Sequence, residues 1–160
     1  MTSRVLVSIR VPCSPIQAFE IFTEEIGDWW ADSDLFRLTP RSPGKLAFEP
    51  PAGGAAGRLI EQLPNGKSFE VGPVRVWSPG ERLVVGWRHA NFGPDNATEV
   101  EVRFEPVGGE TRVTVEHRGW DSVPQQHLAR HGFPLNLTNQ RQGEQWLRSL
   151  ERLKARLNID

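Results

Sequence analysis

The chain has 160 residues, a length typical of one domain, and we expect one domain over residues 1–160. Its 19 Lys and Arg residues against 20 Asp and Glu residues leave a net charge of −1, so there is no uniform basic field to hold nucleic acid or an anionic membrane. The chain has six Trp and eight Phe but no Tyr. The absence of Tyr excludes catalysis by a phenol group. The one cysteine, Cys13, excludes an internal disulfide and a cysteine-based zinc cluster.

Hydrophobic periodicity predicts a strand followed by a helix at the start of the chain. Apolar residues from Val5 to Val11 alternate with other side chains, which is typical of a strand with one buried face. Ser14-Pro15-Ile16-Gln17 has the form of a capping box with Pro at the first helical position. We expect the helix to continue to Ile26 and to end at Gly27.

From residue 44 to 119 the apolar period changes to two, which predicts an antiparallel sheet. Turn-forming sequences at 64–66, 78–80 and 108–109 separate the expected strands. The clearest pair is a hairpin of residues 99–105 and 112–118 with one buried and one solvated face. The remaining strands are expected near residues 46–48, 59–63, 69–77 and 83–89.

A long helix is predicted from Leu137 to Leu157, after an irregular segment with one short helix at 125–130. The long helix carries an apolar stripe formed by Trp146, Leu150, Leu153 and Leu157 and widened by Leu147. This order of elements predicts an α+β fold, in which a curved antiparallel sheet of about six or seven strands wraps around the C-terminal helix. Such an arrangement leaves a cleft between sheet and helix, a common position for an apolar ligand.

Several local sequences form a recognisable series: Pro12-x-x-Pro15 leading into Ala18-Phe19, Ile26-Gly27-Asp28-Trp29-Trp30, residues 57–61, 74–79, 82–87 and 110–117, and Gly143-x-x-Trp146-Leu147. In this order they resemble the START/SRPBCC superfamily, whose fold is the helix-grip. Within it the chain is most similar to the branch named after the heat-shock-protein-90 ATPase activator homologue. The resemblance implies the helix-grip fold over nearly the whole chain, in a superfamily that includes lipid carriers, polyketide cyclases and hormone receptors.

Large aromatic and imidazole side chains are the candidate ligand contacts. His117 has the parity of Val113 and Val115, and His89 has the parity of Trp87, so both histidines are expected to face the cleft. An imidazole there could orient a ligand carbonyl or act as an acid or base, or it could be a structural histidine bonded to the backbone. The candidate ligand-binding residues are Trp29, Trp30, Trp87, His89, His117 and Trp120.

These residues favour binding of a small hydrophobic or aromatic molecule in the cleft. Two alternatives stay open at this point: a cyclase- or hydrolase-like enzyme that uses a cleft histidine, and a chaperone-associated interaction module. For the protein partner, a second copy of this chain in a homodimer stays open beside a chaperone. No catalytic residue is assigned.

We expect no metal site and no cofactor. His127-x-x-x-His131 has the spacing of a chelating pair on a helix, but it lacks a third ligand. The N-terminal sequence has no apolar stretch typical of a signal peptide, and no run approaches the roughly 20 apolar residues of a membrane span. We therefore expect a cytoplasmic protein without membrane insertion.

Overall fold

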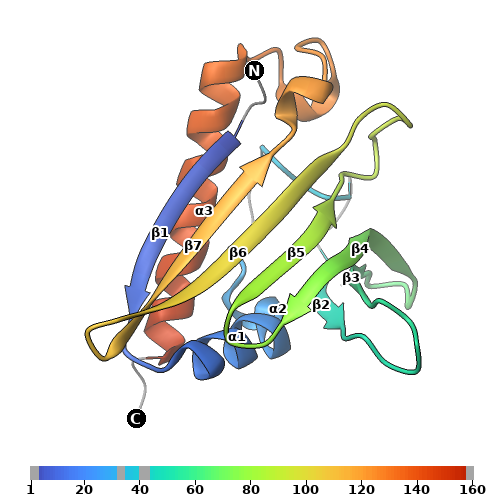
Figure 1. The fold of residues 1–160 in the computed structure, drawn as a ribbon. Helices are drawn as coiled ribbons and strands as arrows, with labels where there is room; N and C mark the ends of the chain where they lie inside the picture. Colours follow the sequence, from blue (N-terminus) through green and yellow to red (C-terminus); the bar gives the residue numbers. More distant parts are fainter. Residues whose placement is uncertain (1–3, 32–34, 40–43, 158–160) are drawn as a thin grey trace.

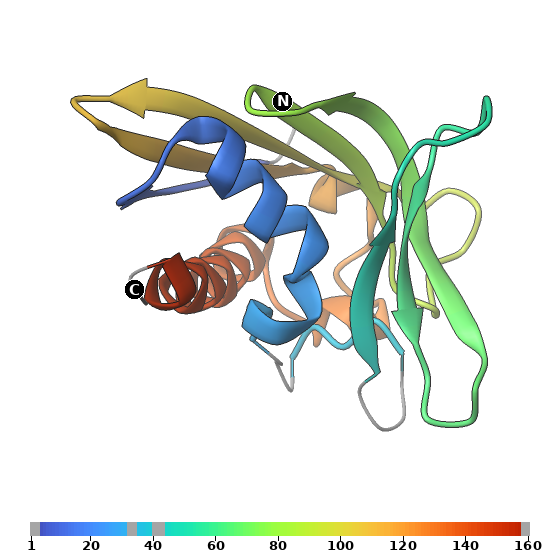
Figure 2. The same ribbon diagram turned by 90° about the horizontal axis from the view of Figure 1, so that it is seen from below.

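Seven antiparallel strands form one curved sheet in the order β1-β7-β6-β5-β4-β3-β2. The computed structural model describes residues 4–31, 35–39 and 44–157. The long helix α3 and the shorter helix α1 lie on the same concave face of the sheet (Figures 1 and 2). The α+β class predicted from the sequence is confirmed. The strands are β1 (Arg4–Val11), β2 (Lys45–Glu49), β3 (Arg58–Gln62), β4 (Ser68–Ser78), β5 (Arg82–Trp87), β6 (Thr98–Val107) and β7 (Glu110–Arg118).

Helix α1 (Pro15–Glu24) begins with the predicted capping box. The Gln17 backbone N–H donates to Ser14 Oγ at 3.3 Å, and the Ser14 N–H donates to Gln17 Oε1 at 3.1 Å. The predicted end was wrong, because the helix stops at Glu24 and a separate turn, α2 (Ile26–Trp29), follows. Gly27 has a different use: a Cβ there would lie 2.7 Å from the Leu46 carbonyl oxygen, so glycine lets β2 approach α2.

Helix α3 (Leu135–Leu157) begins two residues before the predicted start and packs along β1. Its stripe of Trp146, Leu150 and Leu153 is fully buried, as predicted. Leu147 does not widen that stripe, because it is 42% exposed.

Polar side chains occupy the neighbouring strip of α3 instead. Ser149 Oγ accepts a hydrogen bond from the Ala31 N–H at 3.1 Å, and Gln145 Nε2 donates to the Ala31 carbonyl oxygen at 3.3 Å. These bonds satisfy the backbone that follows α2.

The predicted short helix at 125–130 is also replaced, since the structure has two 3₁₀ turns, η1 (Trp120–Ser122) and η2 (Leu128–Arg130).

The outer face of the β6–β7 hairpin is less solvated than predicted. Glu101 is nearly buried, and its carboxylate pairs with Arg82 at 2.8 Å and with Arg118 at 3.0 Å. Although burial acts to raise the pKa of Glu101, the arginine hydrogen bonds lower that pKa to about 2. An arginine–glutamate layer therefore covers this face.

A glycine pair sets the close approach of β4 to β5. A Cβ on Gly72 would lie 1.9 Å from the Gly86 carbonyl oxygen. We expect Gly72→Ala to lower the free energy of unfolding by about 3 kcal/mol or more, because one strand must move. Gly93→Ala is the matched control, since the nearest atom to a Cβ there is 3.6 Å away. Urea unfolding of both variants checks the prediction, and equal losses would contradict it.

Candidate functional site

The six predicted ligand-binding residues lie in one continuous run of ring contacts. The run extends from α2 across β5 and β7 to η1, and every member except Trp30 is buried. Neighbouring ring centroids are 5.3–6.3 Å apart, the range of ordinary aromatic contacts. In order, the contacts are Trp29–Trp30 at 6.3 Å, Trp30–Trp87 at 5.3 Å, Trp87–His117 at 5.9 Å, His117–Trp120 at 5.9 Å and Trp120–His89 at 5.4 Å.

His117 on β7 is held by hydrogen bonds at both ring nitrogens. Trp146 Nε1 donates to His117 Nδ1 at 3.1 Å. Because an indole nitrogen can only donate, Nδ1 is the unprotonated nitrogen and Nε2 carries the proton. Nε2 then donates to Thr98 Oγ1 at 2.9 Å, and Thr98 in turn donates to the Trp87 carbonyl oxygen. This chain of bonds joins α3 to three strands.

The surroundings of His117 keep its ring neutral. Complete burial, with a smaller effect of His89, lowers the pKa of His117 to about 3. With both nitrogens engaged, the imidazole holds α3 on the sheet. This is the structural-histidine alternative of the sequence analysis, with side chains as the main partners.

His89 differs from His117 because one of its ring nitrogens has no hydrogen-bond partner among the described residues. It follows the end of β5, is 2% exposed, and stacks on Phe92 with 5.0 Å between ring centroids. Its Nε2 has no hydrogen-bond partner among the described residues, and Trp120 Nε1 in the neighbouring ring likewise has none. Burial, with smaller effects of His127 and His131, lowers the pKa of His89 to about 3, so the ring is neutral at pH 7. An unpaired buried nitrogen costs about 1–3 kcal/mol.

A cavity of about 210 Å³ lies beside His89, at the end of the sheet where β5 finishes. Three segments surround it: residues 35–38, the turn after β5, and residues 128–131. We call it the His89 pocket. Along the middle of α3, by contrast, the fully buried Trp146 and Leu150 pack on the sheet. The residues that line the His89 pocket are Leu35, Arg37, Leu38, His89, Asn91, Leu128, Ala129 and His131.

His127 and His131 hold the wall of the His89 pocket. His127 Nε2 donates to the Asn91 carbonyl oxygen at 2.9 Å, while its Nδ1 accepts from the Ala129 N–H at 3.0 Å. His131 Nε2 donates to the Leu35 carbonyl oxygen. The two histidines flank η2 and do not share one helix face. Within the described ranges, no group of three potential ligands could hold a metal ion.

A second cavity, of about 320 Å³, lies between α1, β2 and the end of β4, and no pattern in the sequence was taken to predict it. We call it the α1 groove. Phe48 and Trp77 form its aromatic wall together with Phe19. The signal was present in the sequence, because Phe48 has the parity of the buried Leu46. The α1 groove is lined by Ile16, Phe19, Glu20, Thr23, Glu24, Ala47, Phe48, Pro50, Trp77 and Pro79.

Comparison with known proteins assigns the family. The family model described as activator of Hsp90 ATPase homolog 1-like protein matches residues 12–158. The chain belongs to this family. The resemblance found in the sequence is thereby confirmed, and the family's structural relatives share the helix-grip fold. No curated protein sequence matches the chain.

Solved structures with this fold include proteins of several kinds. MLL2253 from Mesorhizobium loti is 18% identical, with a TM-score of 0.65 over 96% of this chain and 95% of that one. DynU16, from the dynemicin biosynthetic locus, is 19% identical, with a TM-score of 0.65 over 98% of this chain and 47% of that one. The anthrahydroquino-gamma-pyrone synthase Txn09, complexed with SUM, is 28% identical, with a TM-score of 0.53 over 95% of both chains.

In the part of the chain that the structure describes, no helix is both long and apolar enough to cross a membrane.

The two buried histidines predict acid destabilisation between pH 6.5 and pH 5. Both keep a pKa of about 3 when folded, while the unfolded chain binds protons near pH 6.5. Protons therefore favour the unfolded state as the pH falls, and by pH 5 each histidine should remove about 2 kcal/mol from the free energy of unfolding. In His117→Gln, which cannot titrate, the loss between pH 7 and pH 5 should be about half. Urea unfolding at both pH values measures this loss of the free energy of unfolding. A loss as large in the variant as in the wild-type protein would contradict the lowered pKa of His117.

Proposed function

We propose that the chain binds a small aromatic or hydrophobic molecule that carries a hydroxyl or carbonyl group, with the His89 pocket as the polar end of the site. One observation carries the proposal: His89 is buried at a cavity and its Nε2 has no partner among the described residues. A ligand oxygen that pairs with this imidazole would remove the cost of the unpaired nitrogen.

Aromatic surfaces beside His89 suit a flat ligand. Phe92 stacks on one side of the imidazole, and Trp120 meets it edge-on at 5.4 Å between ring centroids. Behind Trp120 the run of rings continues through His117 and Trp87 to Trp30 and Trp29. In this proposal that run is a rigid apolar wall, and His89 is the group that recognises the ligand's oxygen.

The volume of the His89 pocket limits how much of a ligand can enter it. Ligand pockets usually enclose about 300–1,000 Å³, and the His89 pocket encloses about 210 Å³. A single ring fits this scale, as does the head of a longer molecule whose remainder leaves past Leu128. Leu128 lines the pocket and is 78% exposed, so it offers apolar surface at the mouth.

A cyclase-like reaction is the second candidate function. Its support is the similarity to the synthase Txn09, at 28% identity over 95% of both chains. An imidazole with a pKa near 3 is a weak base at pH 7, and no hydrogen bond between described residues orients His89 for proton transfer. Binding is therefore the function that the pocket supports best.

Roles as a chaperone-associated module or a homodimer have less support from the surface. Docking onto a protein uses a contiguous apolar patch. The large apolar side chains most exposed in the described ranges stand on different elements: Leu6 on β1, Ile16 on α1, Leu128 on η2 and Leu147 on α3.

A pair of ligands with nearly the same shape tests the proposal. p-Cresol should bind about ten-fold tighter than p-xylene, because only its hydroxyl can pair with His89. In His89→Phe, which keeps an aromatic ring of similar size, the preference should disappear. NMR titration measures both affinities in both proteins, with the indole N–H of Trp120, which lies beside residue 89, as the reporting group.

The p-cresol to p-xylene ratio serves as its own control, because a general loss of folding weakens both ligands together. Equal affinities in the wild-type protein would refute the role of His89, and so would a preference that persists in His89→Phe. Perturbation of the Trp77 indole N–H signal alone would place the ligand in the α1 groove and would also refute the proposal.

A further inference from the structure

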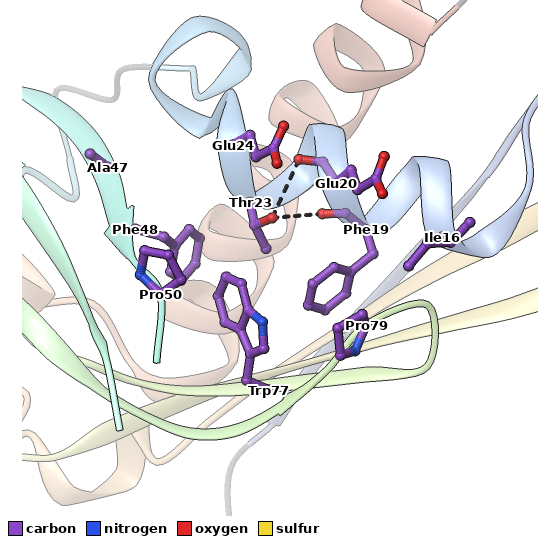
Figure 3. A pocket seen from close by; sticks show the side chains of 10 residues that line it. All are labelled: Ile16, Phe19, Glu20, Thr23, Glu24, Ala47, Phe48, Pro50, Trp77 and Pro79. Atoms are coloured by element: carbon purple, nitrogen blue, oxygen red, sulfur yellow. Dashed lines mark hydrogen bonds between the residues drawn. The ribbon is translucent and has the colours of Figure 1, made fainter. Parts of the chain in front are cut away.

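The α1 groove has an aromatic wall with a half-buried tryptophan at its centre (Figure 3). The Trp77 ring meets Phe19 edge-on at 5.2 Å and Phe48 at 5.9 Å between centroids. Trp77 is not fully enclosed by these contacts, so part of its ring surface is open to an occupant. The groove volume of about 320 Å³ lies within the usual range of small-molecule sites.

Two carboxylates stand on the α1 side of the same groove. Glu20 and Glu24 are four residues apart, project from the edge that α1 forms, and are exposed (Figure 3). Like charges at this spacing destabilise a helix, and Glu24 is also the last residue of α1, where the helix dipole disfavours an anion. No basic residue lies in the last turn of α1 to offset these costs.

Nearby basic side chains are engaged with other carboxylates. Lys45 on β2 pairs with Asp28 at 3.1 Å, and Arg58 on β3 pairs with Glu49 at 2.6 Å. Neither Glu20 nor Glu24 forms an ion pair with any described residue. The Thr23 hydroxyl between them donates to the Phe19 carbonyl oxygen at 2.9 Å. The groove therefore combines an apolar wall with negative charge that the described part of the chain leaves uncompensated.

We propose that the α1 groove is a second binding site, which takes a small organic cation: an ammonium group on an apolar or aromatic body. The ammonium lies at the Trp77 face, where the ring's negative electrostatic face attracts a cation, and Glu20 and Glu24 on the α1 side of the groove add long-range attraction. The apolar body packs against Phe48 and Phe19. A neutral ligand gains only the apolar part of this interaction, so charge is the basis of selection.

The matched probes are 2-phenylethylammonium and 2-phenylethanol, which differ only in the ammonium and hydroxyl groups. At low salt the ammonium compound should bind about ten-fold tighter, from one cation–π contact and two exposed carboxylates. The preference should shrink at 0.5 M salt, because exposed charges are screened. The Trp77 indole N–H signal, assigned by its absence in Trp77→Phe, reports binding in the groove.

The variant that decides the question is Glu20→Gln/Glu24→Gln, which keeps the shape of both side chains. It should bind the two probes equally. Glu105→Gln is the control, because Glu105 is an exposed carboxylate on β6 that alternates with the buried Phe104. The ten-fold preference should persist in this control.

Three results would overturn the proposal. The first is equal affinity of both probes for the wild-type protein, which would make the groove a plain apolar surface. The second is a cation preference that survives in the double variant. The third is the absence of any shift of the Trp77 signal at millimolar 2-phenylethylammonium.

Discussion

The hydrogen bond from Trp146 to His117 is the contact on which the rest of the interior depends. An indole nitrogen can only donate, so the bond decides which imidazole nitrogen carries the proton. That choice makes His117 a donor toward Thr98, and Thr98 then satisfies the Trp87 carbonyl oxygen. The indole donor on α3, with Gln142 Nε2 at 3.3 Å from the same nitrogen, thus determines the hydrogen-bond direction across β7, β6 and β5.

Much of the fold followed from periodicity, because a period of two or of 3.6 residues reports which side chains are buried. The same signal identified Trp146 as core and gave His117 an inward parity. It could not pair the two, since 29 residues separate them and their contact depends on how α3 lies on β7. Leu147 was misassigned for a related reason: it lies about 100° around α3 from Trp146, on the flank opposite Gln145 and Ser149, and that flank is not covered by the sheet, so Leu147 is 42% exposed.

The candidate site, like the fold, could be predicted only in part from the sequence. Sequence reasoning selected six aromatic and imidazole residues, and the structure joins all six by ring contacts. The cavity beside them could not be predicted, because its walls are loops held by contacts distant in sequence, such as Ala90 N–H to the Leu38 carbonyl oxygen and His131 to Leu35. Such loops carry no hydrophobic period. Their placement depends on individual hydrogen bonds that composition and spacing do not encode.

The pairing of β1 with β7 has a consequence for how the chain reaches this structure. Arg4 lies opposite Arg118, so β1, which is synthesised before the other six described strands, has its neighbour in the described sheet at β7, the last of them along the chain. Contacts this far apart in sequence slow folding, because a long loop must close before they form. On the ribosome, β1 therefore leaves the exit tunnel well before its partner exists. Its apolar residues Val5, Val7, Ile9 and Val11 are therefore open to wrong pairing during synthesis.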